Sequence, residues 1–403
     1  MAKKKDADIP EVDFSETTIE EVPNAEDFIK ESIEEKVDES KKLTKAEADF
    51  ASNLQNSFMA HLKNNHEIDT EFKEKVKIPT DVEAFDTILG GGVSPGLVMF
   101  VGNPGSGKTA LACKVIASGQ KRWPGKFNAV FLDSEDSMTK ERLQQLGVNH
   151  PPIEPIPMLT VEKIFQIVEG MATYKEQNPE LIEVPWVIVW DSIANTMTDA
   201  GMLAEDMNQV MGQKARALSH YLPKYIPKMG KYNICLLAVN QLRDKIDLGI
   251  FKKAADLKYL ADKNIPGGKS VLFNSTQLVY IQPVGDVKGE YGFMGTKVRA
   301  KTVKNKLFSP NVELDMIFSF ERGFSSFWTN FELLKKVKRI KAGSWCTLVS
   351  CPEAGKFRQV QALEFYKTKP EFKEAFDRDV AEVLNEEYIE KYKSTAAEAI
   401  DII

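Results

Sequence analysis

The chain has 403 residues, of which 43% are hydrophobic and 28% charged, and its formal net charge is −6. This is enough apolar content for a sizeable core, and the length suits one large domain with appendages. No apolar stretch approaches the ~18 residues of a membrane span, and the basic N-terminus has no apolar segment behind it, so we expect neither a transmembrane helix nor a signal peptide. The four cysteines lack metal-site spacing, which predicts buried thiols.

Charge is distributed unevenly along the chain. Residues 1–40 hold 14 Asp and Glu against five Lys and Arg, and residues 371–403 hold ten against four. The segment 41–370 therefore carries a net charge of +9. A basic body between acidic ends is compatible with nucleic-acid binding. Two interpretations of the tails stay open: they keep the protein in solution, or they compete with DNA for a basic surface.

The N-terminal part divides into two segments. Residues 1–43 are acidic and hold few aromatic side chains, a composition typical of disorder. In residues 44–76, apolar side chains recur every fourth residue, which predicts one face of a helix. These side chains are Phe50, Leu54, Phe58 and Leu62. We expect this stripe to pack on a neighbouring subunit, with packing on the protein's own core as the alternative.

A complete phosphate-binding loop comes next. The run 97–101 predicts a buried strand, residues 102–109 fit G-x-x-x-x-G-K-[ST] without a mismatch, and the residues after them predict a helix. Glycines let backbone N–H groups surround a phosphate, and the helix N-terminus adds positive potential. We expect Lys108 to reach the β- and γ-phosphates and the Thr109 hydroxyl to ligate Mg²⁺. The expected nucleotide contacts are Gly102, Asn103, Pro104, Gly105, Ser106, Gly107, Lys108, Thr109 and Ala110.

Acidic residues end two later apolar runs. The run 186–190 precedes Asp191, which we expect to hold the Mg²⁺ shell beside the phosphate loop. The run 128–132 precedes Asp133 and Glu135. Hydrolysis needs a carboxylate that activates the attacking water. We assign that task to Glu135, and to Asp133 a structural one, capping the following helix.

Apolar runs alternate with helical patterns through the middle of the chain. They lie at 97–101, 128–132, 186–190, 234–239 and 277–281. This alternation predicts an α/β fold, with a mostly parallel sheet covered by helices on both faces. Beyond about residue 330 the pattern changes to a small mixed segment and a charged helical tail.

The order of these motifs resembles the RecA family of recombinases. After the phosphate loop come Asp133-Ser-Glu135, Val189-Trp-Asp191-Ser192, Met211-Gly212, Asn240-Gln241-Leu-Arg243, Gly267-Gly268 and Val303-Lys304-Asn305-Lys306. The resemblance covers about residues 77–325, and the divergent remainder is similar to the phage strand-exchange branch of the family. It implies ATP and Mg²⁺ as cofactors and DNA-dependent ATP hydrolysis. It also implies a cytoplasmic location, in a bacterial cell or a phage-infected host.

The resemblance also implies a domain organisation. Residues 1–43 are expected to form an acidic disordered extension, and 44–76 a helical segment that contacts another subunit. Residues 77–325 are expected to form a RecA-like P-loop ATPase core. Residues 326–403 remain for a small C-terminal domain with an acidic helical tail.

Four further residues receive roles from the resemblance. Gln241 matches a residue that senses the γ-phosphate and signals to the DNA-binding loop behind it. Lys304 and Lys306 match a pair that reaches the ATP site of the neighbouring subunit. Two cations spaced i, i+2 on a strand share one face and can neutralise a transferring phosphoryl group, although a solvated strand face is the alternative. Arg142 stands where the family has an adenine-stacking aromatic, and its planar guanidinium is expected to stack on the base instead.

Two segments resemble the family's DNA-binding loops, about Ala200–Gly212 and Leu242–Lys269. The second is long for a connection without regular structure, which is typical of a functional or mobile segment. Cations for the phosphates and apolar side chains between bases suit sequence-independent binding of single-stranded DNA, and adjacent glycines allow close approach of the backbone. A surface loop without function is the alternative. The expected DNA contacts are Met211, Gly212, Arg216, Ser219, Arg243, Lys245, Ile246, Lys252, Lys253, Gly267, Gly268 and Lys269.

Three functions are considered. The first is a recombinase whose ATP-bound helical filament on single-stranded DNA pairs it with homologous duplex DNA, with single-strand-binding and mediator proteins as possible partners. The second is a ring-forming replicative helicase, and the third is a non-catalytic ATP-binding mediator. The lysine pair at 304 and 306 and the long segment after Gln241 count against the helicase. The complete set of phosphate-loop and acidic residues counts against a non-catalytic protein.

Overall fold

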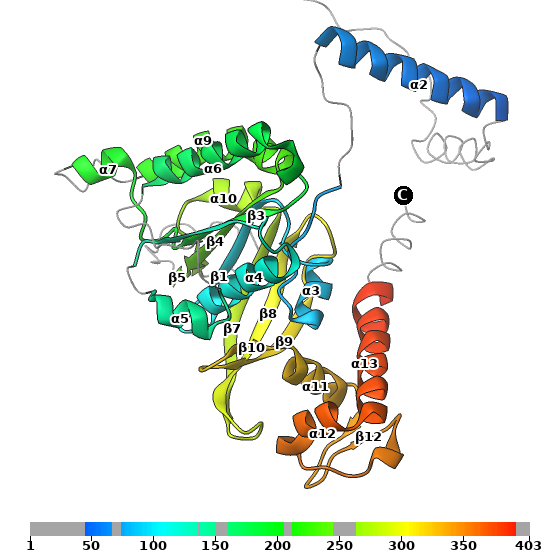
Figure 1. The fold of residues 1–403 in the computed structure, drawn as a ribbon. Coiled ribbons are helices and arrows are strands. Elements are labelled where there is room, and N and C mark those ends of the chain that lie inside the picture. The colour runs from blue at the N-terminus through cyan, green and yellow to red at the C-terminus, as the bar shows by residue number, and fades with distance from the viewer. Residues whose placement is uncertain are drawn as a thin grey trace, which may run out of the picture. The chain divides into compact units, whose positions relative to one another are not determined.

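A computed structural model describes residues 45–66, 74–135, 138–149, 160–204, 212–244 and 263–391. Two separate units are present (Figure 1). The first contains the helix α2 (Lys45–His66), over the segment where the spacing predicts one. Phe50, Leu54 and Phe58 expose 70%, 61% and 57% of their surfaces, so the described residues of this unit do not cover the apolar face of α2.

The second unit is built around an eight-stranded sheet (Figure 1). Its strand order is β10-β9-β8-β7-β1-β4-β3-β2. The five strands from β7 to β2 are parallel, and β8, β9 and β10 continue the sheet antiparallel. The strands are β1 (Gly96–Gly102), β2 (Ala129–Asp133), β3 (Trp186–Asp191), β4 (Ile234–Gln241), β7 (Gln277–Lys288), β8 (Met294–Asn305), β9 (Glu313–Ser319) and β10 (Gly323–Ser325). The predicted α/β fold is confirmed, with an antiparallel extension.

Helices cover both faces of the sheet because the side chains of its central strands alternate between two cores. On β1, Val98 and Phe100 belong to the core shared with α4, whereas Met99 belongs to the core shared with α6 and α9. The helices of the first face are α3 (Glu83–Leu89), α4 (Lys108–Arg122) and α5 (Lys140–Gln145). Those of the second face are α6 (Val161–Gln177), α9 (Gln213–Lys231) and α10 (Lys269–Asn274).

Shorter elements connect these layers. The turn η1 (Pro179–Leu181) precedes β3, and α7 (Asp199–Leu203) follows it. After β4, the strands β5 (Arg243–Asp244) and β6 (Lys263–Asn264) pair antiparallel as a separate two-stranded ribbon. This ribbon brings together the two ends of the long segment that was predicted to bind DNA.

The C-terminal region packs on the α4 side of the sheet. Its aromatic side chains, among them Phe331, Phe357 and Phe372, belong to the same apolar cluster as the core around α4. Its elements are α11 (Ser326–Lys336), β11 (Ile340–Lys341), β12 (Thr347–Leu348), η3 (Pro352–Ala354), η4 (Gln359–Gln361), α12 (Ala362–Thr368), α13 (Pro370–Leu384) and the π-helical turn η5 (Asn385–Glu390). Across the described ranges, no helix has the length and apolar character that a membrane span requires.

Candidate functional site

The phosphate loop lies between β1 and α4. Gly107 has φ of 84° and precedes α4, and a Cβ there would lie 2.9 Å from the ring of Phe324 in β10. Lys108 is buried, and its Nζ donates to the carbonyl oxygen of Asn103 at 2.7 Å and to Oγ of Ser106 at 3.3 Å. Burial lowers the pKa of Lys108 to about 8, although the negative charges of Asp191 and Glu135 oppose this shift. The lysine is therefore folded back onto its own loop.

A hydroxyl and a carboxylate meet beside this loop. Oγ1 of Thr109 donates to Oδ2 of Asp191 at 2.6 Å. Asp191 is the last residue of β3, two strands from β1, and it pairs in register with Asp133 on β2. Burial raises the pKa of Asp191 to about 6, against the hydrogen bond from Thr109, and the charges of Glu135 and Asp133 raise it further. Hard oxygen atoms of this kind are the ligands Mg²⁺ prefers, so the pair fits the predicted metal.

Three donors converge on one oxygen of Glu135. Its Oε1 accepts from Nε2 of Gln241 at 2.9 Å, from Nδ2 of Asn195 at 2.8 Å and from Oγ of Ser192 at 3.2 Å. Glu135 follows β2, Ser192 and Asn195 follow β3, and Gln241 ends β4. The carboxyl ends of parallel strands meet at one sheet edge, and this geometry brings the three segments together. The sequence analysis singled out Gln241 but not Asn195.

Asp133 has a structural position, as expected, but it does not cap the next helix. Its Oδ1 accepts from the backbone N–H of Glu135 and its Oδ2 from that of Met138. The N-cap of α5 is Thr139, whose hydroxyl accepts from the N–H of Arg142. Asp133 thus fixes the turn that presents Glu135, and the helix-capping part of the prediction was wrong because Thr139 lies next to the helix.

Arg142 lies on α5 and is bonded to the turn between β9 and β10. Its Nη1 donates to the carbonyl oxygen of Phe320 at 3.1 Å and to Oε1 of Gln145 at 3.2 Å. Phe320 exposes 52% of its surface and packs edge-on against Phe318. A Cβ placed at Gly107 would lie 3.6 Å from the ring of Phe318 and only 2.9 Å from that of Phe324. Phe320 was not predicted from the sequence, since no motif marks it and only the fold brings its turn to the phosphate loop.

Lys304 and Lys306 differ in their surroundings. Lys304 lies in β8, and its Nζ donates to the carbonyl oxygens of Leu272 and Phe273, both at 2.7 Å, at the end of α10. Burial and the charge of Lys306 lower the pKa of Lys304. Lys306 follows the last residue of β8 and is exposed. The strand therefore ends between the two lysines, and only Lys304 is part of it.

The described ends of the two predicted DNA segments lie around α9. Gly212 is the N-cap of α9, and Arg216 and Ser219 are exposed on that helix. Gly267 and Gly268 have φ of 100° and 78° and are packed closely, since a Cβ would meet Ile193 and Leu218 at Gly267 and Ala215 at Gly268. Close approach to protein atoms and positive φ therefore require glycine at both positions, and the predicted approach of this backbone to DNA phosphates stays a prediction.

The remaining predicted DNA contacts fall partly outside the description. Lys269 is the first residue of α10 and is exposed. For Arg243 only the backbone, in β5, is described. Outside the described residues lie Met211, Lys245, Ile246, Lys252 and Lys253.

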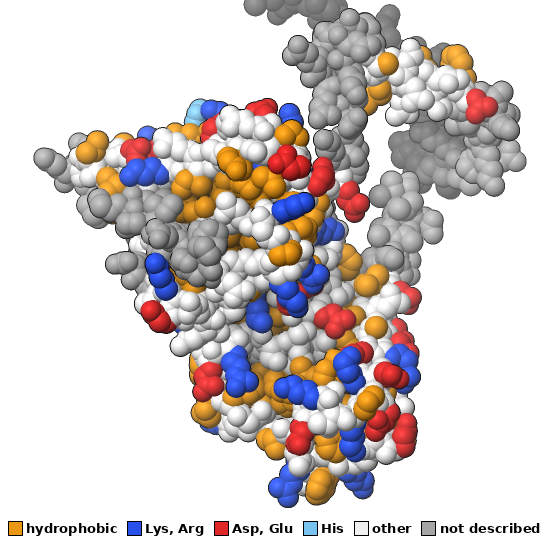
Figure 2. All heavy atoms as spheres, viewed as in Figure 1, with side chains coloured by type: hydrophobic (Ala, Val, Ile, Leu, Met, Phe, Trp, Pro, Cys, Tyr) orange, Lys and Arg blue, Asp and Glu red, His pale blue; other side chains and the backbone are white. Residues whose placement is uncertain are grey.

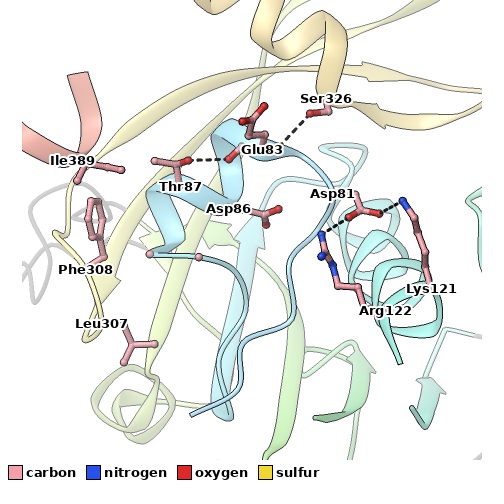
Figure 3. Close-up of a pocket in the computed structure, with 12 residues that line it drawn as sticks. Asp81, Glu83, Asp86, Thr87, Lys121, Arg122, Leu307, Phe308, Ser326 and Ile389 are labelled. Carbon is pink, nitrogen blue, oxygen red and sulfur yellow. Dashed lines mark hydrogen bonds and ion pairs between the residues drawn. The ribbon is translucent and has the colours of Figure 1, made fainter. Parts of the chain in front are cut away.

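A hollow of about 730 Å³ lies at the other end of α4 (Figure 3). Asp81 there accepts from Arg122, at 2.9 Å, and also pairs with Lys121. Asp86, on α3, accepts from the N–H and the hydroxyl of Thr80. A helix of this length spans about 20 Å, so this hollow is separate from the phosphate loop. Its charged groups already have protein partners, and we assign it no role in nucleotide binding.

The strand–loop–helix unit and the acidic residues at the same sheet edge define a P-loop nucleotide-binding protein. Residues 43–325 match the model of the RecA N-terminal domain. Protein RecA of Ehrlichia ruminantium (strain Gardel) is 32% identical over 277 residues, which cover 68% of this chain and 72% of that protein. Protein RecA of Thermus aquaticus is 30% identical over 313 residues, covering 76% and 84%. Protein RecA of Syntrophobacter fumaroxidans is 28% identical over 327 residues, covering 78% and 87%.

The chain belongs to the RecA family. It is a RecA-type recombinase, as the sequence predicted, and neither the helicase nor the non-catalytic alternative is favoured.

Proposed function

We propose that this protein is an ATP- and DNA-dependent ATPase that assembles into helical filaments on single-stranded DNA and pairs that strand with homologous duplex DNA. The observation that carries the proposal is the 2.9 Å hydrogen bond from Gln241 to Glu135. It joins the candidate catalytic carboxylate to the strand end from which the second DNA segment starts. A change in that segment on DNA binding would therefore reach Glu135 directly.

The residues around the phosphate loop suit ATP and Mg²⁺. Thr109 and Asp191 would hold the metal, which when bound neutralises negative charge on the phosphates. Lys108 would exchange the carbonyl of Asn103 for a phosphate oxygen, a stronger, charge-assisted hydrogen bond. Glu135 would accept a proton from the attacking water, and Gln241 would respond to the γ-phosphate.

For the base, we propose a surface formed jointly by Arg142 and Phe320. The hydrogen bond from Arg142 to the carbonyl of Phe320 fixes the two against each other. An exposed aromatic ring and a planar guanidinium both stack on a heterocyclic base. Phe320 would then supply the aromatic face that the position of Arg142 lacks.

We propose that Lys304 and Lys306 act on the nucleotide of a neighbouring subunit. The ammonium group of Lys304 lies on the end of α10, where it donates to the carbonyl oxygens of Leu272 and Phe273. A cation brought by the next subunit would stabilise the charge that develops on the transferring phosphoryl group. Assembly and hydrolysis would thus depend on one interface.

The same assembly would bury the open face of α2. β2 is the edge strand of the large sheet, and edge strands are natural attachment sites for another chain. Beside it lies a hollow of about 820 Å³. Its lining includes Trp123, Phe127, Tyr174 and Trp186. Figure 2 shows hydrophobic side chains gathered beneath α6 on the viewed face. We propose that α2 of one copy docks on this hollow of the next copy.

We further propose bounds for the segments of this chain and a branch of the family to which it belongs. The family match ends at residue 325, which supports the end of the ATPase core there and a small C-terminal domain over 326–403 that packs on the core. The segments 1–43 and 44–76 stay as predicted. We also propose membership in the phage strand-exchange branch, a cytoplasmic location, and single-strand-binding and mediator proteins as partners, from the divergent C-terminal region and the family.

Electron microscopy with single-stranded DNA and a non-hydrolysable ATP analogue tests the proposal. We expect long helical filaments on the DNA only when the nucleotide is present. Closed rings would support the helicase instead. Absence of any nucleotide-dependent assembly would contradict the proposal, and Lys108→Ala provides the control in which binding and assembly are lost together.

A further inference from the structure

Asn195 lies in the turn that connects β3 to the first predicted DNA segment. Its Nδ2 donates to Oε1 of Glu135 at 2.8 Å, although the residue itself is exposed. Gln241, at the root of the second DNA segment, donates to the same oxygen at 2.9 Å. One carboxylate oxygen is therefore bonded to the roots of both DNA segments. An exposed asparagine on an exposed glutamate is not needed for folding, because both groups have access to water.

The turn that carries Asn195 is itself held by the far end of the first DNA segment. Nζ of Lys214, two residues after Gly212, donates to the carbonyl oxygens of Ile193 and Ala194, both at 2.9 Å. A second bond runs between the two ends of the segment, from Oγ1 of Thr198 to Oε1 of Gln213 at 3.1 Å. A displacement of the start of α9 therefore pulls on the two peptide groups that directly precede Asn195.

We propose that Asn195 is a positioning residue that couples the first DNA segment to Glu135. The described contacts form a continuous series: Lys214 holds the turn at Ile193 and Ala194, and the next side chain, Asn195, holds the carboxylate. In the subunit without DNA, Asn195 restrains Glu135. DNA that binds at the first segment shifts the start of α9 and breaks the hydrogen bond from Asn195 to Glu135. The carboxylate of Glu135 is then able to accept a proton from the attacking water. Both DNA segments then act on one oxygen, each through an amide.

This coupling has a thermodynamic consequence that does not require hydrolysis. If DNA binding and the nucleotide site are linked through Asn195, the nucleotide changes DNA affinity by the same factor by which DNA changes nucleotide affinity. Cutting the series at either end reduces that factor. The two ends are Asn195, at the carboxylate, and Lys214, at the DNA segment.

The inference rests on the proposed function, and its test separates the two. Binding of a fluorescent single-stranded oligonucleotide is measured by anisotropy with and without a non-hydrolysable ATP analogue, in wild type, Asn195→Ala and Lys214→Met. The ratio of the two dissociation constants should fall by about threefold or more in each variant, within the usual range of coupling factors. In the double variant the ratio should fall no further, because both substitutions interrupt the same series of contacts. Asn195→Gln, which keeps an amide donor, should restore part of the ratio.

Steady-state hydrolysis gives the second readout. Asn195→Ala should raise kcat without DNA, leave KM for ATP unchanged and so lower the stimulation by DNA. The matched control is Asn385→Ala, since Asn385 is an exposed amide that donates to Oε1 of Glu390 at 2.7 Å in the C-terminal region. An unchanged binding ratio in Asn195→Ala, or an equal fall of kcat with and without DNA, overturns the inference. If the DNA affinity of the wild-type protein does not change when the nucleotide is added, the proposed function is overturned instead.

Discussion

Glu135, the proposed general base, is held by contacts from several segments of the chain. Asp133 fixes the turn by accepting hydrogen bonds from two backbone N–H groups. Three side-chain donors, from Ser192, Asn195 and Gln241, hold Oε1 of Glu135. These contacts come from the ends of β2, β3 and β4. Such contacts restrict the rotation of the carboxylate. Under our proposals the bond from Asn195 restrains Glu135 until DNA binds, while Asp133 fixes the turn from which Glu135 acts as a general base.

Replacing Glu135 with Gln should therefore separate assembly from turnover. The amide keeps the size of the side chain but does not accept a proton, so we expect kcat to fall by about 10²–10⁴-fold. Filaments on single-stranded DNA with ATP should still form, and they should persist because the nucleotide is not consumed. Hydrolysis is measured by phosphate release and assembly by electron microscopy. Glu141→Gln, an exposed glutamate on α5, is the control; wild-type hydrolysis in Glu135→Gln would reject our choice of base.

Asp86 lines the hollow of Figure 3, and its protonation should affect the stability of the fold. Burial raises the pKa of Asp86 to about 7, although the hydrogen bonds from Thr80 oppose this shift. In the unfolded chain the group has its ordinary pKa of about 4. Between these values the folded protein holds a proton that the unfolded protein releases. The contribution of Asp86 to the free energy of unfolding should therefore fall as pH rises from about 4 to about 7 and stay constant above that.

Asp86→Asn removes this pH-dependent loss of stability, because an amide stays neutral and its oxygen still accepts from Thr80. We expect the variant's Tm, relative to wild type, to rise between pH 5 and pH 8 by a few degrees, on a scale of about 2–4 °C per kcal/mol. Thermal unfolding followed by circular dichroism measures both proteins at each pH. Asp286→Asn, exposed on the β7–β8 hairpin, controls for the substitution itself. An equal difference at both pH values would show that burial does not hold the proton on Asp86.

The sequence alone predicted those residues that a motif or an apolar run marks within a few positions. The phosphate loop, Asp191 and Glu135 follow apolar runs within a few positions, so a pattern is enough to find them. Phe320 and Asn195 have no such signal, since they reach the site only because distant segments share one sheet edge. The role of Arg142 stays a prediction for the same reason: its partner, the turn at Phe320, is 178 positions away.

At the scale of elements, β8 and α10 are joined through Lys304. Carbonyl groups at a helix end have no intrahelical partners, and the ammonium group satisfies those of Leu272 and Phe273. The helix α10 begins at Lys269, the last residue of the second predicted DNA segment, and Gly267 and Gly268 just before it pack on neighbouring side chains. A change in that segment on DNA binding would therefore act on the helix end that holds Lys304.

Mixing two inactive variants tests whether Lys304 acts on a neighbouring subunit. Lys304→Ala lacks the cation and Glu135→Gln lacks the base, so each alone should hydrolyse ATP poorly. In a mixed filament with head-to-tail interfaces, about a quarter of the sites in an equal mixture would combine an intact Glu135 with a neighbour's Lys304. We expect DNA-stimulated hydrolysis to recover accordingly, measured against the sum of the separate proteins.

The matched control mixes Lys304→Ala with a chain that carries both substitutions. That mixture contains no interface with both groups, so it should stay inactive. Recovery in the control as well, or no recovery in the first mixture although mixed filaments form, would contradict action between subunits.

The antiparallel strands show what the sequence patterns did not predict. The prediction relied on continuous apolar runs, which mark strands buried on both faces. β8 alternates apolar and charged residues, such as Val298 and Arg299, because its polar side chains pair with those of β9. Strands of this kind give a weaker signal, and the parallel part of the sheet was therefore predicted while its extension was not.

At the scale of the whole molecule, charge is the property that no single element explains. The acidic residues 1–40 have a net charge of −9, and the segment 41–370 has +9. Part of that excess lies in the second segment predicted to bind DNA, since residues 242–269 hold seven Lys and Arg against four Asp and Glu, whereas residues 200–212 hold two acidic residues and no basic one. A DNA backbone and an acidic tail would compete for the same cations, and this competition is screened by salt.

Deleting residues 1–40 should leave the affinity for single-stranded DNA equal or raise it, with the larger gain at low salt. At ~0.1 M salt the Debye length is about 10 Å, so a tail held near the surface only by charge loses most of its effect above that concentration. Anisotropy titrations at two salt concentrations measure this.

A full-length variant with the Asp and Glu of residues 1–40 changed to Asn and Gln is the matched comparison. If charge competes with DNA, neutralisation and deletion raise the affinity alike. A gain from deletion alone would mean that the tail acts through the space it occupies. A large loss of affinity in either variant would mean that the tail supports DNA binding, and the basic body would then have to bind DNA together with its acidic end.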